Sequence, residues 1–187
     1  QLVSEGPFLF THWGVSGPAI LKLSAWAARP LAELNYQAEL RLDLLPQFNQ
    51  EEIREVLFQC KQRQPQRQFS GDPPLPLPKR LWRALTEESA GLAWREVADK
   101  VLNRLSETCK RLTLRITGRS VFKEEFVVAG GVPLKEIDVQ TMESRRSPGI
   151  FLAGEALDVD GVKGGFNFQN AWAGGWVAGE AMAQRCR

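Results

Sequence analysis

The chain has 187 residues, of which 43% are hydrophobic and 25% charged, and its formal net charge at pH 7 is +2. This composition is ordinary for a soluble globular protein, and so small a net charge argues against a nucleic-acid partner held by a strong positive field. No apolar run approaches the ~20 residues that a membrane span needs, and no signal peptide is visible, so we also expect no membrane partner.

The first part of the chain predicts a strand, a helix and a second strand. Residues 7–11 are rich in aromatic and β-forming side chains, and residues 36–44 alternate polar and apolar residues as a half-buried strand does. Between them we expect a helix over residues 18–28. Its side-chain cap would be Ser16, and it would end before Pro30.

A helical module is expected next, inserted between β segments. Three segments carry apolar residues at helical spacing: Gln50–Arg63, 79–89 and 94–110. The proline-rich residues 71–78 must be extended or turning, and we interpret them as a rigid connector rather than as a ligand for proline-binding modules. Strand patterns return over residues 112–117 and 122–128.

The most informative stretch lies near the C-terminus. Residues 150–153 predict a short apolar strand, Gly154 and Glu155 a turn, and residues from about 168 a helix, with a glycine-rich loop before it. This order places backbone N–H groups and a helix N-terminus beside a ligand with negative charge or carbonyl oxygens. Small residues at three- and four-residue spacing predict one smooth, closely packed helix face: Ala171, Gly174, Gly175, Ala178, Ala181 and Met182.

Four sequence segments together resemble the BaiN-like family, also called aminoacetone-oxidase-like FAD-binding flavoproteins. They are FTHWGVSGPAIL near the start, AGGVPLKEI at 129–137, MESRRSPG at 142–149 and GEALDVDGVKGGFNFQNA from Gly154. The resemblance covers essentially the whole chain, but only the C-terminal half of the family. No G-x-G-x-x-G follows a predicted strand near the N-terminus, so the half that binds the FAD pyrophosphate is missing. With Gln1 as its first residue, we expect the chain to be a piece of a longer protein.

The resemblance implies a mixed α/β (α+β) fold. A β-rich domain (residues 1–45 and 112–138) would be interrupted by the helical module (46–111). The last strand and helix of a Rossmann-like FAD-binding domain (139–187) would follow. In the intact protein this implies an FAD-dependent oxidoreductase of a small-molecule substrate, with NAD(P)H as a candidate reductant. This chain would contribute the isoalloxazine and ribitol side of the FAD site and be inactive alone. Alternatives are a non-catalytic fragment or subunit whose partner holds the dinucleotide-binding half, and a binding domain that lost the cofactor.

Each expected FAD contact has a structural alternative, and no catalytic residue is identified. Glu155 would accept hydrogen bonds from ribitol hydroxyls, or it belongs to a solvated acidic turn. The helix after Gly164 would favour charge at N1 and O2 of reduced flavin, or it is packed closely for stability alone. The expected cofactor-binding residues are Gly130, Gly131, Gly154, Glu155, Asp160, Gly164, Gly165, Phe166 and Asn167.

Other motifs predict neither a metal site nor a nucleophile. Asp158 and Asp160 start like a calcium loop, but the later acidic ligands are missing. His12, the single histidine, and Ser16 lack the acidic partner of a hydrolase triad. The three scattered cysteines form no CxxC pair, so we expect no zinc and a reducing, cytoplasmic location.

Overall fold

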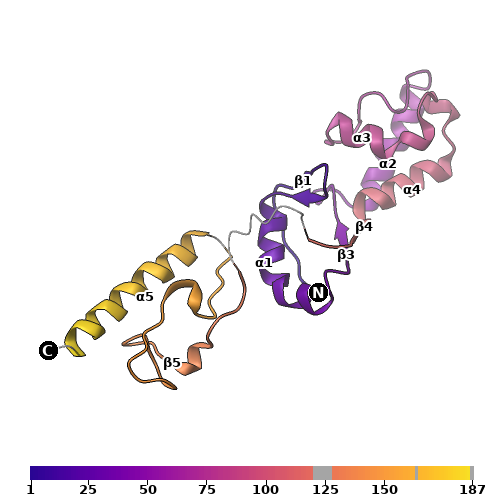
Figure 1. Cartoon of the computed structure of the whole chain (residues 1–187). Coiled ribbons are helices and arrows are strands. Elements are labelled where there is room, and N and C mark those ends of the chain that lie inside the picture. Colours follow the sequence, from indigo (N-terminus) through magenta and orange to yellow (C-terminus); the bar gives the residue numbers. More distant parts are fainter. Residues whose placement is uncertain (120–127, 163, 186–187) are drawn as a thin grey trace. The chain divides into compact units, whose positions relative to one another are not determined.

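The chain divides into two compact units (Figure 1). The computed structural model describes residues 1–119, 128–162 and 164–185. The central unit is Ala38–Thr117, and the terminal unit joins Gln1–Gln37 to Gly118–Arg187. The expected mixed α/β class is confirmed, with five α-helices and three two-stranded antiparallel sheets among the described residues. No helix within those ranges combines the length and the apolarity that crossing a membrane requires.

A strand pair and three helices build the central unit. Strand β3 (Ala38–Leu42) pairs with β4 (Leu112–Ile116), so the two ends of the unit lie side by side. Helix α2 (Gln50–Arg63) packs along α4 (Asp99–Lys110). The remaining helical segments are short: α3 (Lys79–Leu85), η1 (Glu87–Ser89) and η2 (Trp94–Glu96).

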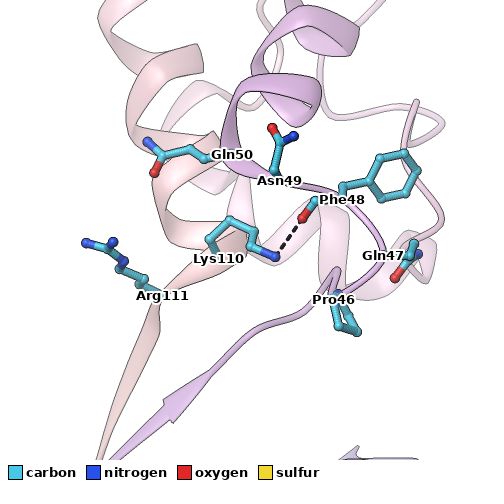
Figure 2. A pocket seen from close by; sticks show the side chains of 7 residues that line it. All are labelled: Pro46, Gln47, Phe48, Asn49, Gln50, Lys110 and Arg111. Atoms are coloured by element: carbon cyan, nitrogen blue, oxygen red, sulfur yellow. Dashed lines mark hydrogen bonds between the residues drawn. The ribbon is translucent and has the colours of Figure 1, made fainter.

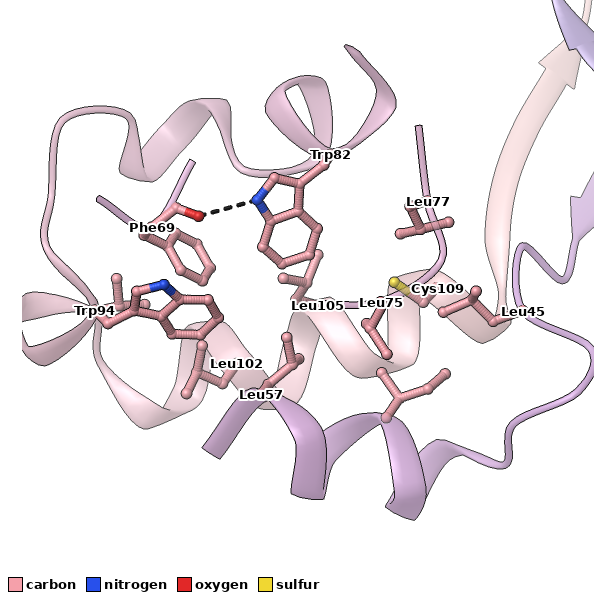
Figure 3. Packing of buried hydrophobic residues seen from close by; sticks show 12 residues of the cluster. Leu45, Leu57, Phe69, Leu75, Leu77, Trp82, Trp94, Leu102, Leu105 and Cys109 are labelled. Atoms are coloured by element: carbon pink, nitrogen blue, oxygen red, sulfur yellow. Dashed lines mark hydrogen bonds between the residues drawn. The ribbon is translucent and has the colours of Figure 1, made fainter. Parts of the chain in front are cut away.

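Three aromatic rings form the centre of this unit (Figure 3). Phe69 meets Trp94 edge to face with 4.7 Å between ring centroids, and the indole N–H of Trp82 donates to the backbone carbonyl of Phe69 at 3.0 Å. All three rings are buried, so each contributes about 1.5–3 kcal/mol or more through the removal of apolar surface from water. Leucines from α2, α4 and the proline-rich segment fill the space around them.

Two of the three helices expected in the central unit differ from the prediction. Helix α2 has the expected bounds, because Asn49 and Glu52 form a reciprocal capping box at its start. The segment expected to be helical over 79–89 leaves α-geometry after Leu85. The segment over 94–110 is broken at Val97, which is extended and whose carbonyl accepts a 2.7 Å bond from the Lys61 ammonium instead of a helical N–H.

The N-terminal part of the terminal unit corrects two predictions. Helix α1 (Pro18–Glu33) follows the hairpin of β1 (Leu9–Phe10) and β2 (Val15–Ser16). Ser16 does not cap α1, because it belongs to β2, and Gly17 precedes the helix without a side-chain bond. Pro30 does not end α1 either. Pro30 has no N–H group, so the last turns of α1 lack one backbone hydrogen bond. The Pro30 carbonyl still accepts a hydrogen bond from the Leu34 N–H at 3.1 Å.

The C-terminal part of the unit is a short helix-and-loop assembly. Its elements are η3 (Leu134–Glu136), β5 (Ile137–Asp138), β6 (Glu143–Ser144), η4 (Gly154–Ala156) and α5 (Gly164–Arg185). A small core joins Ile137, Met142 and Leu157 to Ala178 of α5.

The C-terminal region differs from the sequence-based prediction in its strand and in the start of its helix. The strand over 150–153 is reduced to a single bridge between Phe151 and Glu143, because a strand needs a neighbouring strand along its length. Helix α5 begins at Gly164 rather than near residue 168, so the expected glycine-rich loop is partly its first turn. The strand over 122–128 falls almost wholly outside the described residues.

Candidate functional site

Two glycine-containing segments that are far apart in sequence lie side by side in the terminal unit. The Val132 N–H donates to the Ala156 carbonyl at 2.9 Å, and the Asp158 N–H donates to the Val132 carbonyl at 2.9 Å. Val132 and Leu157 thereby form an isolated parallel bridge. The AGGV segment and the GEALD segment, both expected at the cofactor, are therefore neighbours.

Gly131 is the residue that permits this close approach. Its φ is +119°, a backbone conformation that residues other than glycine rarely adopt. A Cβ here would lie 2.6 Å from the carbonyl carbon of Leu157 and 2.9 Å from the Ala156 carbonyl oxygen. Gly130, by contrast, has no atom within 4 Å of its Cβ position. The requirement for glycine at 131 thus comes from backbone packing inside the chain.

One face of α5 packs tightly against the loop that contains Gly154. A Cβ on Gly154 would lie 3.5 Å from the Ala171 Cβ. Gly174 is buried, and its Cβ position is 3.0 Å from the Met142 terminal methyl and 3.5 Å from the Ala153 Cβ. Gly175, expected on the same smooth face, has nothing within 4 Å. The packed face is therefore narrower than predicted.

Asn167 ties the start of α5 to the preceding loop. Its side-chain oxygen accepts from the Gly161 N–H at 2.7 Å, and its amide nitrogen donates to the Gly161 carbonyl at 3.0 Å. A Cβ on Gly161 would lie 2.9 Å from the Phe166 Cβ. The Asn167 side chain thus fixes the position of the Gly161 backbone in this loop. Gly161 was not among the expected site residues, although a glycine next to an Asp-Val-Asp turn was a visible signal.

The acidic residues of this loop differ in their surroundings. The Arg29 guanidinium of α1 forms ion pairs with Asp158 and, at 3.5 Å, with Asp160. Nothing in the local sequence signalled Arg29 as a neighbour of this loop. Glu155 is exposed, and its carboxylate has no partner among the described residues. Of these carboxylates, Glu155 is the one left available to a ligand hydroxyl.

The first turn of α5 is open to a ligand. Gly164 and Gly165 have no atom within 4 Å of their Cβ positions, and Phe166 is 61% exposed. The first four N–H groups of a helix lack intrahelical acceptors, and no acidic side chain in this turn offsets the positive end of the helix dipole. Among the described residues, the site therefore combines the N–H groups at the start of α5, the Glu155 carboxylate and glycines that allow close approach.

The hollow in the central unit is built differently (Figure 2). Its ammonium group, on Lys110, donates to the Phe48 carbonyl at 2.6 Å and the Leu45 carbonyl at 3.1 Å, and pairs with Asp43 at 2.6 Å. These bonds hold the loop before α2 and leave Lys110 little capacity for a ligand. Residues 1–119, 128–162 and 164–185 contain no cluster of side chains suited to a metal ion.

The groups whose pKa values are shifted lie outside the AGGV and GEALD segments. The pKa of Glu143 is lowered by the Gly149 N–H, which donates to its carboxylate at 2.6 Å, and by Arg185. Lys79 lowers the pKa of Asp72 through a hydrogen bond and its charge. Burial raises the pKa of the Cys109 thiol to about 11, and burial also raises the pKa of the Cys60 thiol. All of these are structural consequences of packing and pairing.

Comparison with known proteins identifies related chains. Residues 1–127 match the family described as "HI0933-like protein barrel and H2TH domain". A 3-dehydro-bile acid delta(4,6)-reductase of Clostridium scindens is 33% identical over 99% of this chain and 46% of the relative. Ribosomal RNA dihydrouridine synthases of Escherichia coli and Haemophilus influenzae are 30% and 32% identical, over 93% and 95% of this chain, and over 42% of each relative. The chain spans less than half the length of each.

Proposed function

The chain belongs to the HI0933-like family, whose matched region is a barrel with an H2TH domain, and we propose that it is the C-terminal part of a flavin-dependent reductase. Membership bears out the family resemblance stated from the sequence. The relatives are about twice as long, which supports an activity that belongs to a larger protein. In this proposal the larger protein includes a dinucleotide-binding half.

The names of the relatives suggest one reaction class. A delta(4,6)-reductase and a dihydrouridine synthase both add hydrogen across a carbon–carbon double bond. In a 3-dehydro-4,6-diene and in the uracil ring, that double bond is conjugated to a carbonyl group. We therefore propose a substrate with an electron-poor double bond activated by a carbonyl. FAD in its reduced form would supply the hydride for such a reduction, and a proton would complete the addition.

The AGGV and GEALD segments and the first turn of α5, together called the glycine-rich site, fit the isoalloxazine and ribitol side of FAD. Backbone N–H groups of Gly164, Gly165 and Phe166 would donate to the ring carbonyls and stabilise negative charge on the reduced ring. Glu155 would accept from a ribitol hydroxyl, and Asp160, already near Arg29, would flank it. Gly130 and Gly154 would leave room for the ring, and the bond from Asn167 to Gly161 would position the loop. Two observations support this assignment: the open space around Gly164 and Gly165 in the first turn of α5, and the exposed Glu155 carboxylate, which has no partner within the described residues.

The experiment uses a chimaera in which this chain replaces the matched stretch of the Clostridium scindens reductase. Glu155→Ala should weaken FAD binding by about 1.5–3 kcal/mol, roughly 10- to 150-fold, because a charged hydrogen-bond acceptor is lost. Flavin fluorescence titration of the apoprotein measures this. Glu107→Ala, which removes an exposed carboxylate from the central unit, is the matched control. Equal affinity of the Glu155→Ala variant and the parent would refute the role of Glu155.

A further test addresses the reaction class. The flavin-loaded, reduced chimaera is mixed with a 3-oxo-4,6-diene steroid and, separately, with uridine-containing ribosomal RNA. Loss of the conjugated double bond in either substrate supports the proposal. Reoxidation of the flavin by neither substrate would argue for the alternative of a scaffold without this activity.

A further inference from the structure

Helix α5 carries a second apolar face that the described chain does not cover. Phe168, Trp172 and Trp176 are 62%, 69% and 71% exposed. The rings of Phe168 and Trp172 stack on each other with 5.9 Å between centroids and 19° between planes. The three side chains follow at four-residue steps, so they form one stripe along the helix.

The same stripe continues toward the C-terminus with small residues. Gly179 and Ala183 follow Trp176 at three- and four-residue steps, and Gly175 lies beside them. Gly175 and Gly179 have no atom within 4 Å of their Cβ positions. A glycine inside a helix is destabilising relative to alanine, and nothing in the described chain requires these two.

This stripe lies on a different side of α5 from the packed face. The residues of the packed face, which contact or face the chain's own loops, project roughly 120° away from the stripe around the helix axis: Asn167, Ala171, Gly174 and Ala178. A helix that is apolar on both sides is characteristic of the interior of a protein rather than its surface. Aromatic side chains exposed in a contiguous stripe likewise mark an interaction surface.

We propose that the outer face of α5 (Phe168, Trp172, Trp176, Gly175, Gly179 and Ala183) packs against the protein segment that corresponds to the unmatched part of the relatives. More than half of each relative's length lies outside the matched stretch, which provides enough protein to form this second layer. The stripe carries no charge, which suits a permanent core contact. The three aromatic side chains would insert into the partner segment. The small residues would let the backbone of that segment approach the helix closely. The identity of the occupant as the dinucleotide-binding half rests on the proposed function.

The test is complex formation between this chain and the unmatched part of the Clostridium scindens reductase, co-expressed as separate polypeptides without added FAD. The wild-type chain should co-purify with it, and the tryptophan emission should shift to the blue as Trp172 and Trp176 become buried. The double variant Trp172→Gln/Trp176→Gln should weaken the complex at least tenfold. Trp13→Gln, which alters a tryptophan that is also 71% exposed, is the control and should bind as the wild type does.

Gly179→Ala separates docking from folding. It should raise the thermal midpoint of the chain alone, because alanine favours the helix, yet weaken the complex, because the added methyl group keeps a partner backbone from approaching closely. Either failure of the wild-type chain to form the complex, or binding that none of these α5 changes affects, would overturn the proposal. So would a homodimer of the chain that the double variant disrupts. A complex that forms as described but binds no FAD would instead refute the proposed function alone.

Discussion

Neighbouring residues of this chain can share a backbone conformation and still serve different purposes. Gly130 and Gly131 both have positive φ values, +126° and +119°. Only Gly131 touches another segment, the backbone of Ala156 and Leu157. Asn167 likewise differs from its exposed neighbours because both ends of its amide bind Gly161. At this scale, contact with the second segment decides which residue is indispensable to the fold.

We predict that Gly131→Ala destabilises the terminal unit more than Gly130→Ala does. Both changes place a side chain at an unfavourable φ, which costs about 1 kcal/mol or more. Gly131→Ala adds a clash 2.6 Å from the Leu157 carbonyl carbon, which costs about 1–3 kcal/mol more. Urea unfolding followed by circular dichroism measures the difference. Equal loss in the two variants would contradict the packing role of Gly131.

The two described cysteines should differ in reactivity. Cys109 is fully buried and its pKa is raised to about 11, whereas Cys60 is only partly buried. In a Cys186→Ser background at pH 8, a thiol-reactive dye should therefore label Cys60 first and Cys109 only after unfolding. The raised native pKa also means that the stabilising contribution of the neutral Cys109 thiol is complete below about pH 8.5 and is lost as the pH rises toward 11. Fast labelling of Cys109 in the native protein would contradict its burial.

Individual elements are specified to different degrees by their own residues. Helix α2 has a complete local signal, because Asn49 caps it, acidic residues occupy its first turn and basic residues its last. Helix α1 contradicts its local signal, since it passes through Pro30 and ends where Asn35 and Tyr36 adopt positive φ values. Helix α5 has neither strong periodicity nor an acidic first turn, and depends on packing for its stability.

The α2 cap provides a prediction at this scale. Asn49→Ala removes the acceptor for the Glu52 N–H, at 2.9 Å, and should cost about 1 kcal/mol of central-unit stability. Gln50→Ala, one residue later and outside the capping box, should cost at most a few tenths. Thermal unfolding of both variants tests this. A loss for Gln50→Ala as large as that for Asn49→Ala would show that the cap contributes nothing specific.

At the scale of the whole molecule, the two units are stabilised in different ways. The larger core lies entirely within Ala38–Thr117. The terminal unit joins two distant stretches, and its small core lies within the second of them, between Val132 and Ala178. The terminal unit exposes aromatic residues on α5 and holds the glycine-rich site. The central unit therefore has the properties of an independent domain, whereas the terminal unit leaves apolar surface uncovered.

This difference predicts that residues 38–117 fold when expressed alone. The fragment retains every member of the Trp82–Trp94–Phe69 core and the β3–β4 pair that brings its ends together. It should unfold cooperatively, with a thermal midpoint within about 5 °C of the corresponding transition in the whole chain. A fragment that is unfolded by circular dichroism would show that the terminal unit is needed for its stability.

Local sequence determined those features whose cause is local. The α2 bounds follow from the capping box, β3 and β4 from alternating residues, and the family resemblance from contiguous motifs such as AGGV and GEALD. Tertiary structure decided the rest. Val97 breaks a predicted helix because Lys61, far away in sequence, binds its carbonyl, and Ser16 is lost as a cap because Leu9 pairs with it. The pairing of Val132 with Leu157 requires the chain to return upon itself, so Gly131 is needed at a place that no nearby residue reveals.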